Sequence, residues 1–296
     1  MSDARFVLTP RGDFSLAKAI RFLQSFAPLS GPDGDEPDEV LRLVFCADGD
    51  WCPVAARVRQ SVAGRVTVTV DGPADPDRLR AQVERMLSLD VDASTLPDVV
   101  AGDPVAAALV ERFRGLRPVC FPSPYEAACW AVLSQRIQMT QAARIRRRIC
   151  DELGHAFELD GLRMSTFPAP ERLRDTPSIK GLPQVKVARL HAIATAALDG
   201  RLDASVLRAA GPQQALADVQ RLPGIGPFGA ELVLIRGAAE PDHFARSERR
   251  LHAAMGAAYS VPGDDVDALE AIASRWSPFR SWVGFLFRAH AAYTDA

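Results

Sequence analysis

Apolar residues along this chain follow two different periods, and the change of period divides the sequence. Four segments either alternate apolar with polar positions or are rich in β-branched side chains, which is typical of strands. They are residues 5–9, 41–47, 54–58 and 66–70. Residues 15–26 and 77–89 instead repeat apolar positions at helical spacing, and the acidic stretch 31–39 is predicted to be an exposed loop between a helix and a strand. We therefore predict a small α+β domain over residues 1–90.

Strand patterns disappear after about residue 90. Helical patterns then follow one another, separated by residues that interrupt helices. These are Pro118, Pro122, Pro168, Pro170, Gly181, Pro183, Gly200, Gly211, Pro223, Pro262 and Pro278. Residues 91–296 are therefore predicted to be all helical, so the expected fold class is an α+β N-terminal domain followed by a mostly α-helical domain.

One helix start is marked clearly. Ser123 and Glu126 form a capping-box pattern, with Pro124 at the first helical position. The helix that follows is predicted to bury Ala128, Val132 and Leu133.

The helical pattern breaks over residues 134–140, where Thr140 is predicted to cap the next helix. A polar break between two buried helices suits a functional loop, and it suits a plain interhelical turn equally well.

Composition narrows the class of protein. A chain of 296 residues with 48% hydrophobic content is long enough for one large or two ordinary globular domains. The N-terminal residues contain no continuous apolar region, and the longest apolar runs are too short to span a bilayer, so we expect a cytoplasmic protein with no membrane partner. The five cysteines are irregularly spaced and lack a nearby set of histidines, which argues against disulfides and a zinc site.

Charge gives no global sign of nucleic-acid binding, because the formal net charge is −2. A DNA-binding prediction must therefore rest on a local surface. One basic cluster lies on a predicted helix, and it suits either contacts with backbone phosphates or a solvated helix face. Its members are Arg144, Arg146, Arg147 and Arg148.

The segment LPGIGPFGAE, residues 222–231, is typical of two helices joined by a very tight hairpin. Gly224 and Gly226 can adopt positive φ angles and allow close approach to the backbone, and Pro227 suits a first helical turn. The helix that follows directs free amides outward, which suits a phosphate. An ordinary glycine-capped turn is the simpler alternative, but the segment is longer and more constrained than a cap requires.

Two carboxylates follow the hairpin, at Asp242 and Glu248. Either is expected to face the hairpin across a short connection, close to a DNA strand held by its phosphates. The alternative is a helix-start role, in which Ser247 caps a helix and Glu248 interacts favourably with the helix dipole.

Several segments together resemble one family. The small N-terminal α+β domain, SPYEAACWAVLSQRIQMTQAARI, LPGIGPFGAELVLIRG, PDHFARSERRL and RWSPFRSWVGFLF occur in the order found in the bacterial 3-methyladenine DNA glycosylase II (AlkA) family. That family belongs to the helix-hairpin-helix DNA glycosylases, and the resemblance covers nearly the whole chain. It implies a TBP-like domain over residues 1–90 and a helix-hairpin-helix glycosylase domain over residues 91–296.

The resemblance also implies site residues. The amides of Gly224, Gly226 and Gly229 are expected to hold DNA backbone phosphates. A monovalent cation, Na⁺ or K⁺, would be held by the main-chain carbonyls of Gln220, Leu222 and Ile225. No other cofactor is expected. The family's catalytic Asp is matched here by Glu248, whose side chain is one methylene longer.

The wedge that fills the gap left by a flipped base falls on Arg136, directly after the matching Gln135, with Ile137 as the alternative. The base pocket falls on Phe228, Leu232, Trp282 and Arg288. An arginine there and fewer aromatic faces would weaken the attraction for a cationic alkylated purine. Further residues that either line the cleft or pack in the core are Phe14, Trp130 and Phe279.

The function implied is that of a monofunctional DNA glycosylase in base excision repair. It would flip alkylated bases of the 3-methyladenine type out of damaged duplex DNA and hydrolyse their N-glycosidic bonds, acting as a monomer in the cytoplasm, at the nucleoid. A Schiff-base lyase is not expected, because the only lysines, Lys18, Lys180 and Lys186, are distant from the hairpin in sequence. One alternative is a non-catalytic protein that recognises lesions or deformed DNA. Another is an adaptor whose hairpin binds protein.

Overall fold

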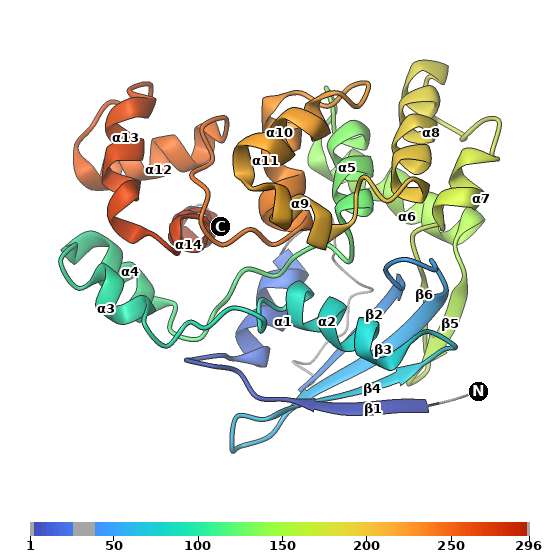
Figure 1. The fold of residues 1–296 in the computed structure, drawn as a ribbon, viewed down its shortest axis with the longest axis horizontal. Helices are drawn as coiled ribbons and strands as arrows, with labels where there is room; N and C mark the ends of the chain where they lie inside the picture. The colour runs from blue at the N-terminus through green and yellow to red at the C-terminus, as the bar shows by residue number, and fades with distance from the viewer. Residues whose placement is uncertain (1–2, 26–38, 295–296) are drawn as a thin grey trace.

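The computed structural model describes residues 3–25 and 39–294. A four-stranded antiparallel sheet with strand order β1-β4-β3-β2 occupies the lower part of Figure 1. Its strands are β1 (Asp3–Leu8), β2 (Val40–Cys46), β3 (Pro53–Gln60) and β4 (Val66–Asp71). All four predicted strands are confirmed. The predicted loop 31–39 lies outside the described residues, except for Glu39.

Two helices accompany the sheet, and both were predicted. They are α1 (Leu16–Ser25) and α2 (Pro76–Met86). Along β4, Val66, Val68 and Val70 are fully buried while the residues between them are partly exposed. This alternation places one face of the sheet in the core, as the period of two requires.

The remaining described residues are mainly helical, and most of their helices lie above the sheet in Figure 1. The helices are α3 (Leu96–Val100), α4 (Pro104–Arg112), α5 (Pro124–Leu133), α6 (Met139–Leu153), α7 (Pro170–Arg174), α8 (Gln184–Leu198), α9 (Ala204–Ala210), α10 (Pro212–Gln220), α11 (Pro227–Leu232), the π-helical turn η1 (Val233–Gly237), α12 (Arg249–Tyr259), α13 (Val266–Ala273), the 3-10 turn η2 (Ser274–Trp276) and α14 (Arg280–Thr294). Two strands, β5 (Ala156–Leu159) and β6 (Leu162–Ser165), interrupt this run.

The β5–β6 hairpin corrects the prediction of an all-helical region after residue 90. Each strand is only four residues long, too short for a clear alternating pattern. The signal that could have identified it is the turn Asp160-Gly161, where both residues have positive φ angles. The Asp160 carboxylate accepts hydrogen bonds from Arg42 Nε at 2.8 Å and Arg57 Nε at 3.1 Å, which fixes this hairpin to β2 and β3.

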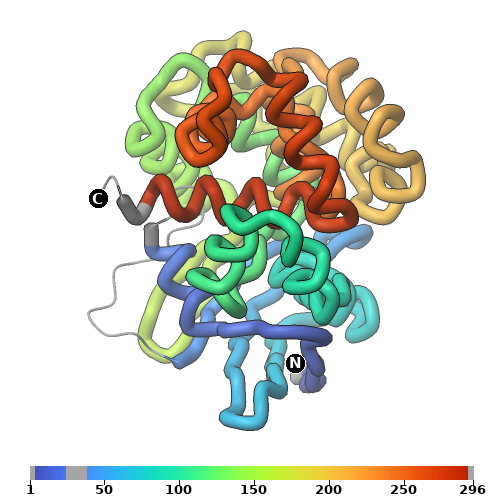
Figure 2. Tube along the Cα trace, turned by 90° about the vertical axis from the view of Figure 1, so that its left-hand side faces the viewer, coloured from blue at the N-terminus to red at the C-terminus, as the bar shows by residue number. Residues whose placement is uncertain are grey.

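Buried apolar residues form two large clusters. The first joins the sheet, α1, α2 and α4 to the C-terminal helices α12–α14, and the second lies within α5–α11 and η1. In Figure 2, α14 runs between the N-terminal elements and the other C-terminal helices. The first cluster therefore contains residues from both sides of position 90. The division into domains at residues 1–90 and 91–296 stays a prediction.

The five cysteines are free thiols, and four of them are buried. Burial raises the pKa of Cys46 to about 12 and that of Cys150 to about 11, so these two stay protonated at neutral pH. Within residues 3–25 and 39–294, no helix has the length and apolar character needed to cross a membrane.

Candidate nucleic-acid interface and acid site

The predicted hairpin is present between α10 and α11. Gly224 has φ +87°, a left-handed conformation that favours glycine. Gly226 instead has an extended backbone, with φ −95° and ψ −176°, which corrects the expectation of positive φ at both positions. A Cβ added at Gly226 would meet no atom within 4 Å, so this corner of the hairpin faces open space.

Three amides of the hairpin have no protein acceptor among the described residues. They are the N–H groups of Gly224, Gly226 and Gly229. Pro227 occupies the first position of α11, as predicted. Gly229 is buried, and a Cβ there would press on Ile225 at 3.3 Å, so its lack of a side chain also serves packing.

The first helical turns beyond the hairpin carry two predicted pocket residues. Phe228 is 48% exposed, which is unusual for a phenylalanine. Leu232 lies four residues further along, on the same face of the helix, and packs partly buried against the second core cluster.

Glu248 is the N-cap of α12. Its Oε1 accepts a hydrogen bond from the Arg250 amide at 3.0 Å, so Glu248 takes the capping role considered for Ser247. Its Oε2 lies 3.8 Å from Arg288 Nε of α14. The side chain is 25% exposed, so the carboxylate remains accessible. The structure thus brings together Glu248 and the predicted pocket residue Arg288.

Sequence reasoning missed Glu231, which links α11 to the loop before α12. Its carboxylate is buried and accepts a hydrogen bond from the Ser247 amide at 2.9 Å. Its other oxygen lies 3.8 Å from His243 Nε2. Because Ser247 directly precedes Glu248, this contact fixes the acid relative to the helix that follows the hairpin.

Asp242, the second predicted acid, is held by protein partners. It accepts hydrogen bonds from Arg280 Nε at 2.7 Å and Ser277 Oγ at 2.8 Å. Burial raises the pKa of Asp242, but these hydrogen bonds outweigh it and hold the pKa below its usual range. Asp242 is therefore interpreted as a structural ion-pair partner. This favours Glu248, the other predicted acid, as the functional one.

The three predicted wedge residues lie in the wedge loop, residues 134–138, and differ in their surroundings. Gln135 Nε2 donates to the Gly224 carbonyl at 2.6 Å, and Ile137 packs partly buried against the second core cluster. Arg136 is exposed and has φ +57°, which is uncommon for a residue with a Cβ.

Both predicted caps around α5 and α6 need correction. Ser123 accepts from the Glu126 amide at 3.1 Å, as expected, but the Glu126 carboxylate accepts from Arg146 Nη2 at 2.7 Å instead of closing a capping box. A charged partner stabilises the buried Glu126 carboxylate more strongly than a backbone amide would. Helix α6 begins at Met139, so Thr140 lies inside its first turn and does not cap it.

The other aromatic candidates are in the interior. Trp282 is 3% exposed and packs with Phe279 and Ala93, with the Arg117 guanidinium 5.4 Å from its ring. Trp130 is buried in the second cluster, and Phe14 packs partly buried against the first.

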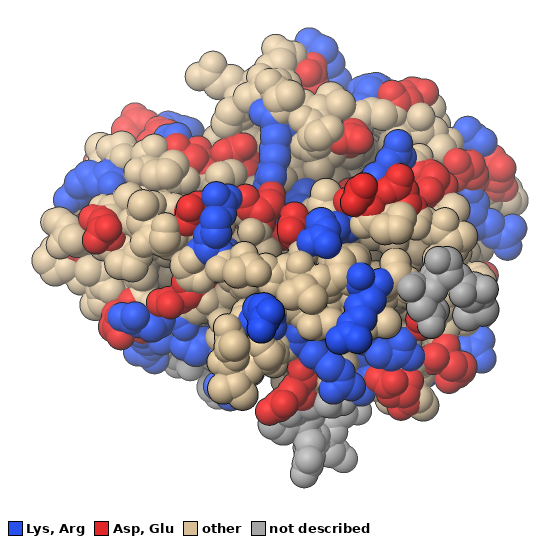
Figure 3. Space-filling view, turned by 60° about the horizontal axis from the view of Figure 1, so that its bottom comes forward, with Lys and Arg blue, Asp and Glu red and all other residues tan. Residues whose placement is uncertain are grey.

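The basic cluster on α6 is divided between the interior and the surface. Arg146 pairs with Glu126, and Arg148 donates to the Lys180 carbonyl. Arg144 and Arg147 are exposed. On the face that Figure 3 presents, basic and acidic side chains are interspersed, as the net charge of −2 suggests.

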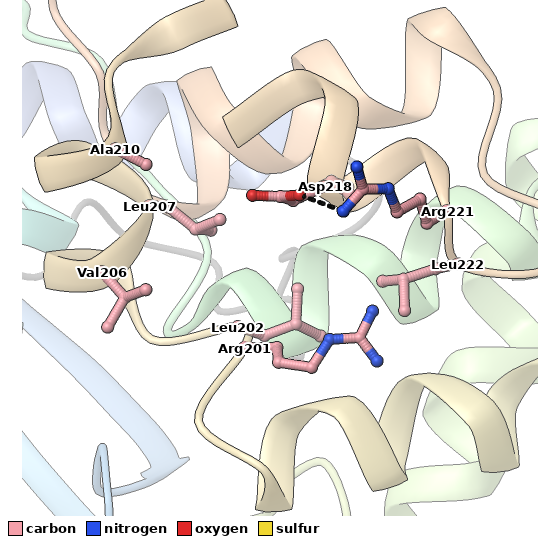
Figure 4. A pocket seen from close by; sticks show the side chains of 9 residues that line it. Arg201, Leu202, Val206, Leu207, Ala210, Asp218, Arg221 and Leu222 are labelled. Atoms are coloured by element: carbon pink, nitrogen blue, oxygen red, sulfur yellow. Dashed lines mark hydrogen bonds and ion pairs between the residues drawn. The ribbon is translucent and has the colours of Figure 1, made fainter. Parts of the chain in front are cut away.

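A cavity of about 360 Å³ lies beside the hairpin, between α9 and α10. Arg201 and Arg221 border it, and Arg221 pairs with Asp218 at 2.8 Å (Figure 4). A second cavity, of about 520 Å³, is lined by residues of α3, α4 and α14, including Trp282. Neither cavity includes Glu248.

Sequence comparison finds relatives among DNA repair enzymes. The chain is 28% identical over 221 residues to a probable bifunctional transcriptional activator/DNA repair enzyme AlkA of Mycobacterium tuberculosis, covering 74% of this chain and 44% of that protein. It is 27% identical over 236 residues to DNA-3-methyladenine glycosylase 2 of Escherichia coli, covering 78% of each chain. The chain therefore spans less than half the length of the mycobacterial relative. No family model matches it.

The fold is similar to that of a 3-methyladenine DNA glycosylase from Archaeoglobus fulgidus. The TM-score is 0.78 at 21% identity, covering 97% of this chain and 98% of that one. An 8-oxoguanine glycosylase/lyase of Clostridium acetobutylicum gives a TM-score of 0.67 at 14% identity, covering 99% and 97%. These likenesses show the fold, with its small antiparallel sheet and many helices. By sequence similarity and fold together, the chain resembles the 3-methyladenine DNA glycosylase II (AlkA) family.

Proposed function

We propose that this protein is a monofunctional DNA glycosylase of base excision repair, which removes damaged bases from duplex DNA by hydrolysis. One observation carries the proposal. A hairpin whose three amides have no acceptor among the described residues, and whose corner at Gly226 is open, is joined to the loop that presents Glu248 through the hydrogen bond that Ser247 donates to Glu231. A phosphate-binding element and an accessible carboxylate are thereby held in a fixed relation.

The hairpin amides would hold backbone phosphates of the strand that carries the lesion. The carbonyls of Gln220, Leu222 and Ile225 would hold a monovalent cation beside them. Gln220 ends α10, where carbonyls lack intrahelical partners, and this supports the assignment. The cation would supply positive charge next to the phosphate.

Glu248 would act on the sugar. As the N-glycosidic bond breaks, its electron pair leaves with the base and positive charge develops on the sugar ring. A carboxylate beside C1′ stabilises that charge and orients a water molecule, whose oxygen bonds to C1′ while its proton passes to the carboxylate. A base that is already cationic leaves as a neutral molecule without a strong general acid.

Arg136 is the wedge residue that the contacts favour, because Gln135 and Ile137 are engaged with the hairpin and the core. Phe228, Leu232 and Arg288 would line the base pocket, whereas Trp282 is buried with Phe279 and Ala93. The proposed partner is duplex DNA containing damaged bases, bound by a monomer in the cytoplasm, at the nucleoid.

A non-catalytic DNA-binding role is the second candidate, and two contacts of Glu248 favour it. Its carboxylate caps α12 and lies near Arg288, so part of its negative charge is already compensated.

Base release decides between the two functions. Duplexes carrying 3-methyladenine, 7-methylguanine, hypoxanthine or ethenoadenine are incubated with the protein, and abasic sites are measured. If the protein is a glycosylase, abasic sites should form in at least one duplex. Tight binding of all four without base release would support the non-catalytic candidate, and salt-insensitive or absent binding would support the adaptor.

A further inference from the structure

Two cations at the start of α8 lie against the hairpin and the wedge loop. The Arg189 side chain crosses Gly224 so closely that a Cβ there would lie 2.5 Å from Arg189 Cδ. Arg189 Nη1 also donates to Gln135 Oε1 at 3.0 Å. Lys186 Nζ donates to the carbonyls of Leu133 at 2.8 Å and Gln135 at 3.0 Å. A lysine that is distant from the wedge loop in sequence is therefore its neighbour in space.

In the part of the chain that the structure describes, Lys186 and Arg189 have no carboxylate partner. Within residues 3–25 and 39–294, neither Lys186 nor Arg189 lies within ion-pair distance of an acid. Burial lowers the pKa of Lys186, and the positive charge of Arg189 lowers it further. Lys186 stands in the first turn of α8, where the helix dipole disfavours a cation. Like charges placed together at such a position destabilise the folded protein, so a ligand that compensates them would explain their placement.

Both side chains retain unused donors. A guanidinium has five N–H groups and an ammonium has three. Among the described residues, Arg189 uses one and Lys186 uses two.

Exposed apolar side chains mark the same segments. Six large apolar residues are exposed in the described part of the chain, and three of them belong to segments that these hydrogen bonds join. Met139 follows the wedge loop, Val185 precedes Lys186, and Phe228 follows the hairpin. Such a concentration is expected of a surface that a large partner covers.

We propose that Lys186 and Arg189 bind a DNA backbone phosphate beside the one held by the hairpin, so that α8 is a DNA-binding element of this protein. The inference rests on the proposed DNA-binding function and adds two residues to it. Gln135 links the new contact to the wedge loop, because its amide donates to Gly224 and accepts from Arg189. Phosphate binding at α8 would therefore also fix the position of the wedge.

The test is the salt dependence of DNA binding. Kd for a duplex with a tetrahydrofuran abasic analogue is measured over a range of salt concentrations for wild type, Arg189→Gln, Lys186→Gln and the double variant. Each single change is expected to weaken binding at low salt by about tenfold and to reduce the slope of log K against log salt by about one. In the double variant, the slope is expected to fall by about two. Arg5→Gln, on the exposed edge strand β1, removes the same charge far from the hairpin and should leave the slope unchanged.

Two further variants distinguish a direct contact between Arg189 and phosphate from a purely structural role of Arg189 in positioning the wedge loop. Gln135→Ala breaks the hydrogen bonds to Arg189 and Gly224 without changing the charge, so its slope should equal that of wild type. Arg189→Lys keeps the charge and should keep the slope. Wild-type slopes in both Arg189→Gln and Lys186→Gln, with folding verified by thermal unfolding, would overturn the inference while leaving the proposed function intact. A wild-type protein that does not bind the duplex would overturn both.

Discussion

Two regions of this molecule differ in how many hydrogen bonds the protein makes to their charged side chains. In the α4 region, residues 103–117, Arg117 is 1% exposed and donates hydrogen bonds to five main-chain carbonyls. On the surface formed by the hairpin, the wedge loop and the start of α8, Arg189 is half-buried and donates one hydrogen bond among the described residues. The two arginines have the same donors and differ in how many of them the protein itself uses.

The acids show the same contrast. Asp103 is 4% exposed and accepts from Trp276 Nε1 at 3.1 Å, Tyr259 Oη at 2.9 Å and the Ala106 amide at 3.2 Å. Glu248 is 25% exposed and accepts one hydrogen bond among the described residues, from the Arg250 amide, while Arg288 Nε lies 3.8 Å away. Charges with a full set of protein partners hold the fold together, whereas charges with few partners, beside an open glycine corner, remain available to a ligand. Each prediction below tests this division.

Glu248→Gln should give the largest effect. The amide keeps the shape of the side chain but removes the negative charge that would stabilise the sugar, so base release should fall by about 10³-fold. The DNA dissociation constant should stay within about twofold, since phosphate contacts dominate affinity. Glu248→Asp, which introduces the residue that the family resemblance leads us to expect, is the control and should remain active. Base release that persists in the Gln variant would remove Glu248 from the reaction.

Arg117→Met tests the opposite region. Its buried carbonyl partners would lose their donors, so the free energy of unfolding should fall by about 3 kcal/mol or more. Denaturant unfolding measures this, and the salt slope of DNA binding should not change. Arg112→Met, at the exposed end of α4, should change stability by about 0.5 kcal/mol at most. An Arg117 variant with wild-type stability would contradict the view that full hydrogen bonding makes this arginine structural.

The two hairpin glycines are likewise expected to differ, one affecting stability and the other DNA binding. Gly224→Ala should destabilise the protein by about 1–3 kcal/mol, because an alanine there has an unfavourable φ and collides with Arg189. Gly226→Ala should leave stability nearly unchanged, since its backbone is extended and its surroundings are open. It should weaken DNA binding by about tenfold, equivalent to about 1.4 kcal/mol, by blocking close approach of a phosphate. Wild-type affinity in Gly226→Ala would mean that the open corner does not face DNA.

The parts of this fold that sequence could predict are those with local causes. The four strands follow from alternating and β-branched residues, and the hairpin follows from glycine and proline at fixed spacing. The β5–β6 hairpin was missed because four-residue strands carry too little pattern, although Asp160-Gly161 marked its turn.

Contacts between distant segments could not be predicted from one sequence. Glu231 and Ser247 are sixteen positions apart, and Lys186 and Gln135 are fifty-one apart. Nothing in the local pattern of either pair indicates the other member. The same limit explains why Glu126 was expected to cap its own helix and instead pairs with Arg146. The contacts within a functional surface that is built from several distant segments therefore cannot be predicted from one sequence.

The smallest expected effect is the response of the α4 region to acid. Burial raises the pKa of Asp103, but hydrogen bonds from Trp276, the Ala106 amide and Tyr259 outweigh it and hold the pKa below its usual range. A carboxyl whose pKa is lower in the folded state contributes stability above its unfolded pKa, near 4, and this contribution is lost as the pH falls through the folded pKa. Denaturant unfolding at a series of pH values should therefore show wild type losing about 1 kcal/mol more than Asp103→Asn as the pH falls below about 4. Parallel losses in the two proteins would mean that the hydrogen bonds to Asp103 do not distinguish its charged form from its neutral form, and the contrast with Glu248 would then rest on accessibility alone.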